Sequence, residues 1–144
     1  DALRDVEGTE KWRPRDDFIL VGPGAICNMD FVGLIEEHKR RRADDKNWLI
    51  TSIFRRGDPQ MAKESKLVIS IDEESSQLVG YSVVEWRQGR SLELDVEMVF
   101  GRGRRKALKI LADVIDCGVD VCSPEILVEF KENFDFDRMR DYLR

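Results

Sequence analysis

The stretch that decides the fold is residues 18–54, FILVGPGAICNMDFVGLIEEHKRRRADDKNWLITSIF. It opens with an uninterrupted apolar run, Phe18–Val21, which is closed by Gly22, Pro23 and Gly24. A short apolar run between turn residues is typical of a strand that is buried on both faces. We therefore expect a buried strand at the start of this stretch.

A helix is predicted directly after this strand. Asp30 can cap it, because an Asp side chain accepts from the free backbone N–H groups of the first turn. Apolar residues and one histidine then recur at helical spacing: Phe31, Leu34, Ile35 and His38. Residues 47–54 are rich in β-branched and apolar side chains and predict the next strand. Since a strand–helix–strand crossover normally joins parallel strands, we expect an α/β fold with a mixed, mostly parallel sheet and flanking helices.

The flanking sequence adds further elements to this unit. Ala2, Leu3 and Val6, followed by Gly8, predict the end of a helix. The polar turn at 72–77 joins two β-rich runs into a β-hairpin. The other expected elements are hairpin strands at 67–71 and 78–84, strands at 92–98 and 114–121, a helix capped by Ser123 with Ile126, Leu127 and Phe130 on its buried face, and a short helix at 137–143. No repeat or linker interrupts the chain, so residues 1–144 are expected to form a single domain.

Composition excludes several classes of protein. The chain has 144 residues, 42% hydrophobic and 37% charged, with a formal net charge of −5. These values fit one soluble globular domain and exclude wholesale disorder, a membrane span and a nucleic-acid binder that uses its whole surface. Three cysteines without metal-site spacing, Cys27, Cys117 and Cys122, predict reduced, structural thiols in a cytosolic or nuclear protein.

Four groups of residues are candidates for chemistry, and each also has a structural explanation. The basic loop Gly101–Lys106 could cradle a phosphate, but it joins apparent strands and predicts a solvated turn. The run Lys39–Arg42 suits the end of a helix or a contact with RNA. His38 is expected to be a satisfied histidine at the edge of the core. The remaining group consists of Asp113, Asp116 and Asp120.

These three acids are poor candidates for a shared metal site. On a strand, Asp116 and Asp120 would share a face about 13 Å apart, too far for common coordination. Asp116 remains a site candidate as a buried, hydrogen-bonded acid at the end of the sheet. The residues alone thus predict an α/β domain without an assembled active site.

The order of motifs resembles a nucleotidyltransferase (sugar-nucleotide pyrophosphorylase-like) domain. The resemblance rests on the strand Phe18–Val21, the glycine turn, Asn28 and the helix that contains Glu36–Arg40. Within that family, the run Asp116–Pro124, DCGVDVCSP, followed by Glu132–Phe136, ENFDF, is similar to the epsilon subunits of eukaryotic translation initiation factor 2B. The likeness covers nearly the whole chain and is densest at 16–54 and 113–143.

The resemblance also implies which family features this chain lacks. Active members carry a metal-binding Asp just after the glycine turn, at a position that falls on Gly24 or a neighbour here. Their Glu-Lys-Pro run would follow the second hairpin strand, where this chain has Tyr81–Glu85 without a lysine. We therefore expect no catalytic residue, no cofactor-binding residue and no metal ligand, and no cofactor.

The resemblance implies a truncated, Rossmann-like domain that contributes assembly surface to a cytoplasmic multisubunit complex. Its expected partners are the other subunits of initiation factor 2B, the gamma subunit first, and initiation factor 2, the substrate of guanine-nucleotide exchange. Membranes and nucleic acid are not expected partners, and the exposed strand edges predict self-association. The alternative is a piece of an active sugar-1-phosphate nucleotidyltransferase, and a third hypothesis is an RNA contact through Lys39–Arg42 and Arg102–Lys106.

Overall fold

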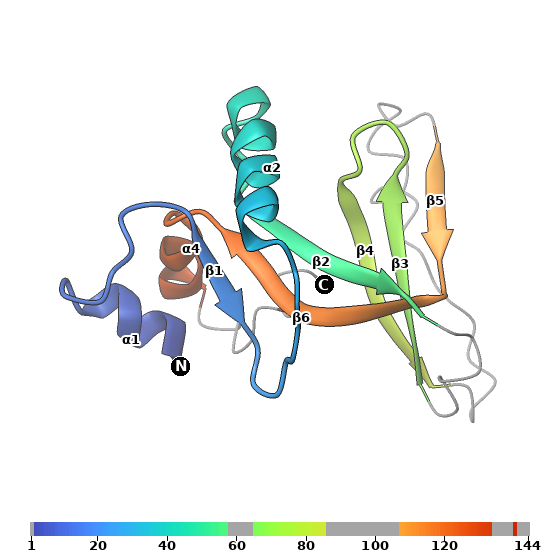
Figure 1. Cartoon of the computed structure of the whole chain (residues 1–144), viewed down its shortest axis with the longest axis horizontal. Coiled ribbons are helices and arrows are strands. Elements are labelled where there is room, and N and C mark those ends of the chain that lie inside the picture. The colour runs from blue at the N-terminus through green and yellow to red at the C-terminus, as the bar shows by residue number, and fades with distance from the viewer. Residues whose placement is uncertain (1, 58–64, 86–106, 134–139, 141–144) are drawn as a thin grey trace. The chain divides into compact units, whose positions relative to one another are not determined.

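The computed structural model describes residues 2–57, 65–85, 107–133 and 140. The chain divides into two compact units, residues 1–53 with 117–141 and residues 54–116 with 142–144. The elements in chain order are α1 (Ala2–Gly8), β1 (Phe18–Val21), α2 (Phe31–Asp44), β2 (Ile50–Arg56), β3 (Ser65–Asp72), β4 (Leu78–Glu85), β5 (Leu108–Leu111), β6 (Val114–Cys122) and α4 (Ile126–Glu132), as labelled in Figure 1.

The strands of the first unit belong to a sheet of order β1-β6-β2, and its neighbours are antiparallel. Phe18 lies opposite Cys122 and Val21 opposite Val119 in the β1–β6 ladder. At the two ends of the β6–β2 pair, Ser123 N–H donates to Leu49 O at 2.9 Å and Gly57 N–H donates to Asp113 O at 2.7 Å. Rising numbers on one strand thus meet falling numbers on the other, as an antiparallel pair requires.

The predicted mixed α/β class is confirmed, but the mostly parallel sheet is wrong for the strands that the structure describes. β1 and β2 do run in the same direction around α2, yet β6 lies between them and is antiparallel to both. The crossover rule gives the relative direction of the two strands and does not say whether a third strand separates them. The end of β1 is also less buried than predicted, since Val21 is 49% exposed.

The core of the first unit joins the end of β6 to α4. Val119, Val121 and Cys122 are fully buried, and so are Ile126 and Leu127; Phe130 is 2% exposed. Consecutive buried residues on β6 show that both faces of the strand are covered at this end. The predicted buried face of α4 is therefore confirmed.

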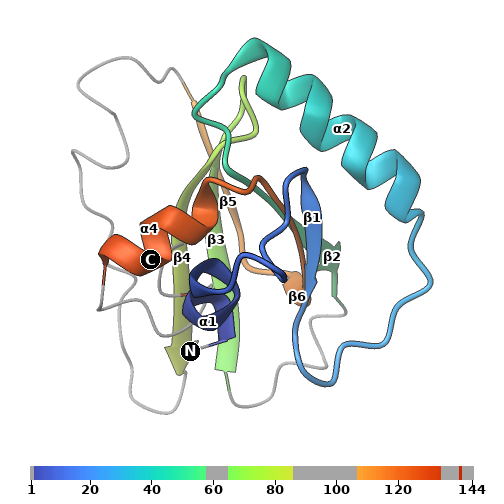
Figure 2. The same ribbon diagram turned by 90° about the vertical axis from the view of Figure 1, so that its left-hand side faces the viewer.

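The two terminal helices of this unit lie side by side in both ribbon views, and α2 lies apart from them (Figures 1 and 2). Arg4 fixes α1 to the end of α4 by donating through Nε to Phe130 O at 2.8 Å. The predicted helix end at Ala2–Gly8 is thus confirmed, and its neighbour is α4. No helix in the described part of the chain is long and apolar enough to cross a membrane.

The start of α2 agrees with its predicted cap. Asp30 is the N-cap, and its Oδ1 accepts from Gly33 N at 3.1 Å. A Cβ on Gly33 would lie 2.6 Å from Asp30 Oδ2, so a side chain at this position would displace the cap. The close contact between the Asp30 cap and position 33 therefore favours glycine there.

The second unit contains an antiparallel sheet of order β4-β3-β5. Ile69 lies opposite Tyr81 on β4 and opposite Leu111 on β5. The turn after β3 is closed by Asp72, whose Oδ1 accepts from the N–H groups of Glu74 and Ser75 at 2.9 and 3.0 Å. The predicted hairpin is confirmed. The predicted strand at 92–98, the basic turn at 101–106 and most of the helix at 137–143 lie outside the described residues.

Candidate functional site

The turn after β1 is where the family resemblance places a metal-binding carboxylate. Gly24 has φ +82° there, a backbone conformation that favours glycine. Gly22 N–H donates to Gly118 O at 2.7 Å, and a Cβ on Gly22 would lie 3.2 Å from that oxygen. No residue from 18 to 29 carries a charge. The turn therefore brings two glycines close together and carries no carboxylate of its own.

The three aspartates considered above have separate partners. Arg56 donates to Asp113 and lowers the pKa of that carboxyl. Tyr81 OH donates to Asp116 Oδ2 at 3.1 Å, and Arg140 Nη1 lies 2.9 Å from both carboxylate oxygens of Asp120. Asp116 is thus hydrogen-bonded as predicted, but it is only partly buried. Among the described residues, no group of three His, Cys, Asp or Glu side chains could hold a metal ion.

A serine, a histidine and a threonine meet inside the first unit in an order that could suggest a nucleophile and its base. His38 Nε2 lies 3.1 Å from Ser123 Oγ, and His38 Nδ1 lies 2.8 Å from Thr51 Oγ1. Both His38 and Ser123 have no exposed surface, and burial lowers the pKa of the imidazole. A substrate cannot reach a fully buried hydroxyl, so this group holds α2, β2 and the start of α4 together.

This network also corrects the predicted cap of α4. The sequence pattern assigned the cap to Ser123, whereas the N-cap residue is Glu125 and makes no side-chain cap bond. The Ser123 Oγ instead lies 3.1 Å from His38 Nε2, and its hydroxyl donates to Trp48 O at 3.4 Å. His38 itself is confirmed as a satisfied histidine, although it lies deeper than the expected edge position. Trp48 completes the network by donating from its indole N–H to Thr51 Oγ1 at 2.8 Å.

The basic run at the end of α2 is used mainly inside the unit. Arg40 and Arg41 both donate to Glu37, and these bonds lower the pKa of the Glu37 carboxyl. Arg41 also stacks 5.0 Å from the Trp48 ring centroid. Arg42 bridges two carboxylates, those of Asp17 and Glu125.

Of the four cations, only Lys39 has no partner among the described residues. An RNA contact through this run would compete with the internal pairs. The other half of that hypothesis, Arg102–Lys106, lies outside the described residues.

The cysteines do not form a reactive site in this structure. None of the three cysteines, all of which lie in the described residues, forms a disulfide, and Cys122 is buried. Burial raises the pKa of the Cys122 thiol, which keeps it protonated and unreactive.

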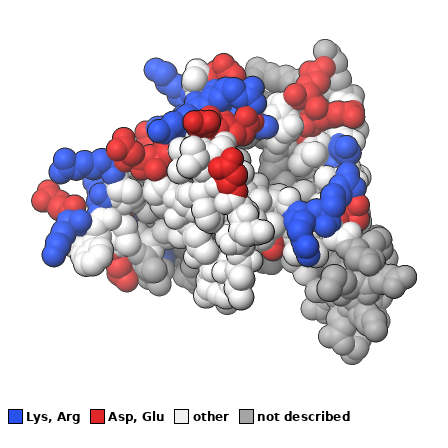
Figure 3. Space-filling model, viewed as in Figure 1, with Lys and Arg blue, Asp and Glu red and all other residues white. Residues whose placement is uncertain are grey.

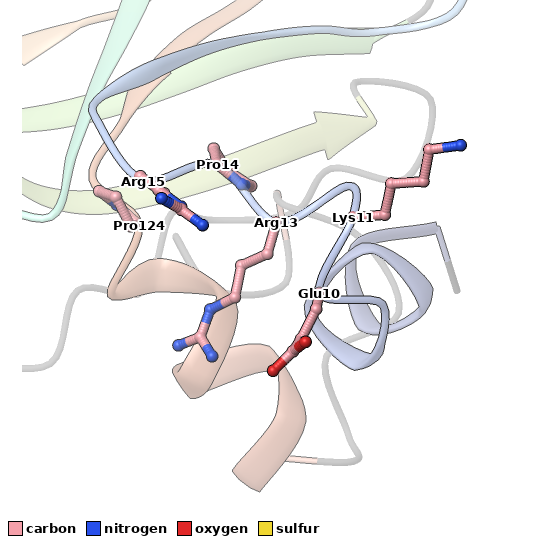
Figure 4. Close-up of a pocket in the computed structure, with 6 residues that line it drawn as sticks. All are labelled: Glu10, Lys11, Arg13, Pro14, Arg15 and Pro124. Carbon is pink, nitrogen blue, oxygen red and sulfur yellow. The ribbon is translucent and has the colours of Figure 1, made fainter.

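A shallow hollow of about 760 Å³ lies between the segment after α1 and the start of α4. Its lining is Glu10, Lys11, Arg13, Pro14, Arg15 and Pro124, shown in Figure 4. The sequence patterns predicted no element and no site at residues 9–15. The signal for this segment was present in the run Lys11-Trp12-Arg13-Pro14-Arg15, which combines cations with an aromatic ring.

Known proteins are similar to this chain over nearly its whole length. No protein-family model matches the chain. Translation initiation factor eIF2B subunit epsilon of Schizosaccharomyces pombe is 34% identical over 143 residues, which cover 97% of the chain. The resemblance to the epsilon subunit of initiation factor 2B is confirmed. The eIF2B subunit epsilon of Dictyostelium discoideum is 29% identical over 147 residues, which cover 99% of the chain. The chain spans about a fifth of the length of these relatives, 20% in each case.

These relatives also bear on the alternative function. Both are named as an initiation-factor subunit, and neither name mentions sugar-nucleotide synthesis. An active sugar-1-phosphate nucleotidyltransferase is therefore not favoured.

Proposed function

We propose that this chain is a non-catalytic assembly segment of an eIF2B epsilon-type subunit. The observation that carries the proposal is similarity to that subunit over 97–99% of the chain. The turn at Gly24 supports the non-catalytic part, because it brings no carboxylate to the place where the resemblance would put a metal ligand. The complete subunit would act in guanine-nucleotide exchange on initiation factor 2, in the cytoplasm.

The uncharged surface that follows β1 suits an assembly role. Figure 3 shows an area without Lys, Arg, Asp or Glu over β1 and the turn after it, next to the charged side chains of α2. Val21 at the end of β1 is 49% exposed, and Ile26 in the segment that follows is 100% exposed. Exposed apolar surface that lies together commonly marks a protein interface.

The edge of β1 offers a second means of association. In the described sheet, β1 pairs with β6 and forms one edge. An unpaired edge strand presents free backbone N–H and C=O groups to another chain. We propose that the gamma subunit covers this surface first, that other subunits of the complex and initiation factor 2 bind the complete protein, and that the isolated chain self-associates through it.

Co-purification with the gamma subunit tests the assembly role. The Ile26→Asp variant should lose the gamma subunit, because a carboxylate would have to be buried in the interface. Ile110→Asp on β5 is the matched control, since Ile110 is also exposed, at 51%, and should keep the partner. Equal retention by both variants would refute the assigned surface.

Titration with Mg²⁺ together with a nucleoside triphosphate or a nucleotide sugar tests the non-catalytic claim. We expect no heat of binding above that of buffer and no turnover. Micromolar binding with turnover would refute the non-catalytic role and restore the nucleotidyltransferase alternative.

A further inference from the structure

The segment between α1 and β1 is an ordered turn that holds a tryptophan in solvent. Thr9 O accepts from Trp12 N at 2.9 Å and from Arg13 N at 3.2 Å. The Thr9 hydroxyl donates to Asp5 O at 3.0 Å and so ties the turn to α1. Trp12 is nevertheless 69% exposed. These bonds order the backbone of the turn and leave the Trp12 ring in solvent, and a large exposed aromatic side chain is characteristic of binding hot spots.

Cations flank this tryptophan in the sequence, and their charges are only partly neutralised. The Lys11 ammonium lies 5.8 Å from the Trp12 ring centroid. Arg13 lies 3.6 Å from the Glu7 carboxylate, which is also 3.0 Å from Lys131, so two cations share one acid. Arg15 has no charged partner among the described residues.

The shape of the hollow next to this turn limits what can bind there. Three cations and one acid, Glu10, line it together with Pro14 and Pro124. Figure 4 shows Arg13 and Glu10 extending in the same general direction, whereas Lys11 points away from them. The prolines supply apolar surface without backbone donors. The hollow therefore offers positive charge beside apolar surface.

We propose that this surface, the Trp12 turn with the hollow beside it, binds a short acidic peptide segment of a partner protein. Carboxylates of the peptide would pair with Arg13 and Arg15, since guanidinium groups bind carboxylates in a bidentate geometry. An apolar side chain of the peptide would cover the Trp12 ring and remove it from water. The recognition is independent of the β1 surface proposed above for assembly.

A nucleic acid fits this surface less well than an acidic peptide. A phosphate backbone needs a continuous track of cations. Here Glu10 interrupts the track, and the chain as a whole carries a net charge of −5. Three of the four cations at the end of α2 are already paired.

Fluorescence anisotropy with the 144-residue chain tests the proposal. The probe is a labelled synthetic peptide of alternating Glu and Leu, compared with the same peptide carrying Lys in place of Glu and with a labelled oligouridylate. The Glu peptide should bind, with an affinity that falls as salt is raised, and the other two should not. Absence of binding by the Glu peptide would overturn the proposal, and tighter binding of oligouridylate would assign the surface to single-stranded nucleic acid instead.

Matched variants locate the binding. Trp12→Ala and Arg15→Glu should each weaken the Glu peptide by ~tenfold or more, as removal of a hot-spot contact does. Both positions are exposed, so the circular dichroism of these variants should match that of the parent chain. Lys109→Glu on β5 makes the same charge change at an exposed position outside the turn and should leave binding unchanged. An equal loss in Lys109→Glu would show that net charge alone drives the binding.

Discussion

The buried histidine makes the stability of this chain depend on pH in a way that can be isolated. His38 is the only histidine in the sequence and has no exposed surface. Burial is the largest cause that lowers its pKa below the ordinary value of 6.5; Asp17 opposes the shift and Arg42 adds to it. The folded state therefore resists a proton that the unfolded state accepts. The sign follows directly: stability is complete above pH 6.5 and is lost as the pH falls through the range between the ordinary and the lowered pKa.

The size of this effect has a ceiling set by proton linkage. Each pH unit in that range costs at most ~1.4 kcal/mol of unfolding free energy. Between about pH 7.5 and about pH 5.5, an unfolded histidine becomes mostly protonated, so the total loss is at most ~1.4 kcal/mol. The lowered pKa values of Glu37 and Asp113 act below the ordinary carboxyl values of 4.5 and 3.8, outside this range. The titration of His38 should thus dominate the change of unfolding free energy with pH between about pH 7.5 and about pH 5.5.

Urea unfolding at these two pH values measures the effect. The parent chain should unfold at lower urea concentration at the acidic pH. The His38→Gln variant should be less stable overall but nearly independent of pH, because Gln can bond to both hydroxyls and does not titrate in this range. A pH dependence of stability that persists in His38→Gln, or its absence in the parent chain, would contradict this role of His38.

Two further predictions concern packing and backbone geometry. Phe130→Ala should lower the free energy of unfolding by ~3–5 kcal/mol, because the ring is 2% exposed and its removal leaves a cavity; a loss below ~1 kcal/mol in chemical denaturation would show that the site collapses around the gap. Gly118→Ala should cost ~1–2 kcal/mol, since φ is +64° and the added Cβ would meet only Ala25 Cβ at an ordinary 3.7 Å. Gly8→Ala has open space and no positive φ, so it should be close to neutral in the same assay, and an equal loss there would argue against backbone strain at Gly118.

Local patterns in this sequence predicted local structure well. The cap at Asp30, the apolar face of α4 and the polar turn of the β3–β4 hairpin depend on residues within a few positions of one another. Each also rests on a simple physical rule, such as the need of the first helical N–H groups for an acceptor. These elements could therefore be placed without knowledge of the rest of the chain.

The features that sequence could not predict depend on residues far apart. The antiparallel position of β6 between β1 and β2 requires Phe18 to meet Cys122, and no local pattern encodes that choice. Ser123 lies where a helix cap is expected from the sequence, but its hydroxyl oxygen contacts His38, 85 residues away in the chain. The order of motifs carried the resemblance to a known family. Neither that order nor the spacing of the motifs predicted the hydrogen-bonded turn that presents Trp12.

The contacts of α2 bear on the proposed assembly surface after β1. His38 ties this helix to β2 and to Ser123, while Arg42 ties it to the segment before β1 and to Glu125. Arg40, Arg41 and Arg42 of the basic run are thus paired with acidic side chains of the same unit. The turn after β1 keeps its exposed Ile26 among uncharged neighbours. A surface of this kind gains most from an apolar partner, because burying it there requires no charge to be desolvated.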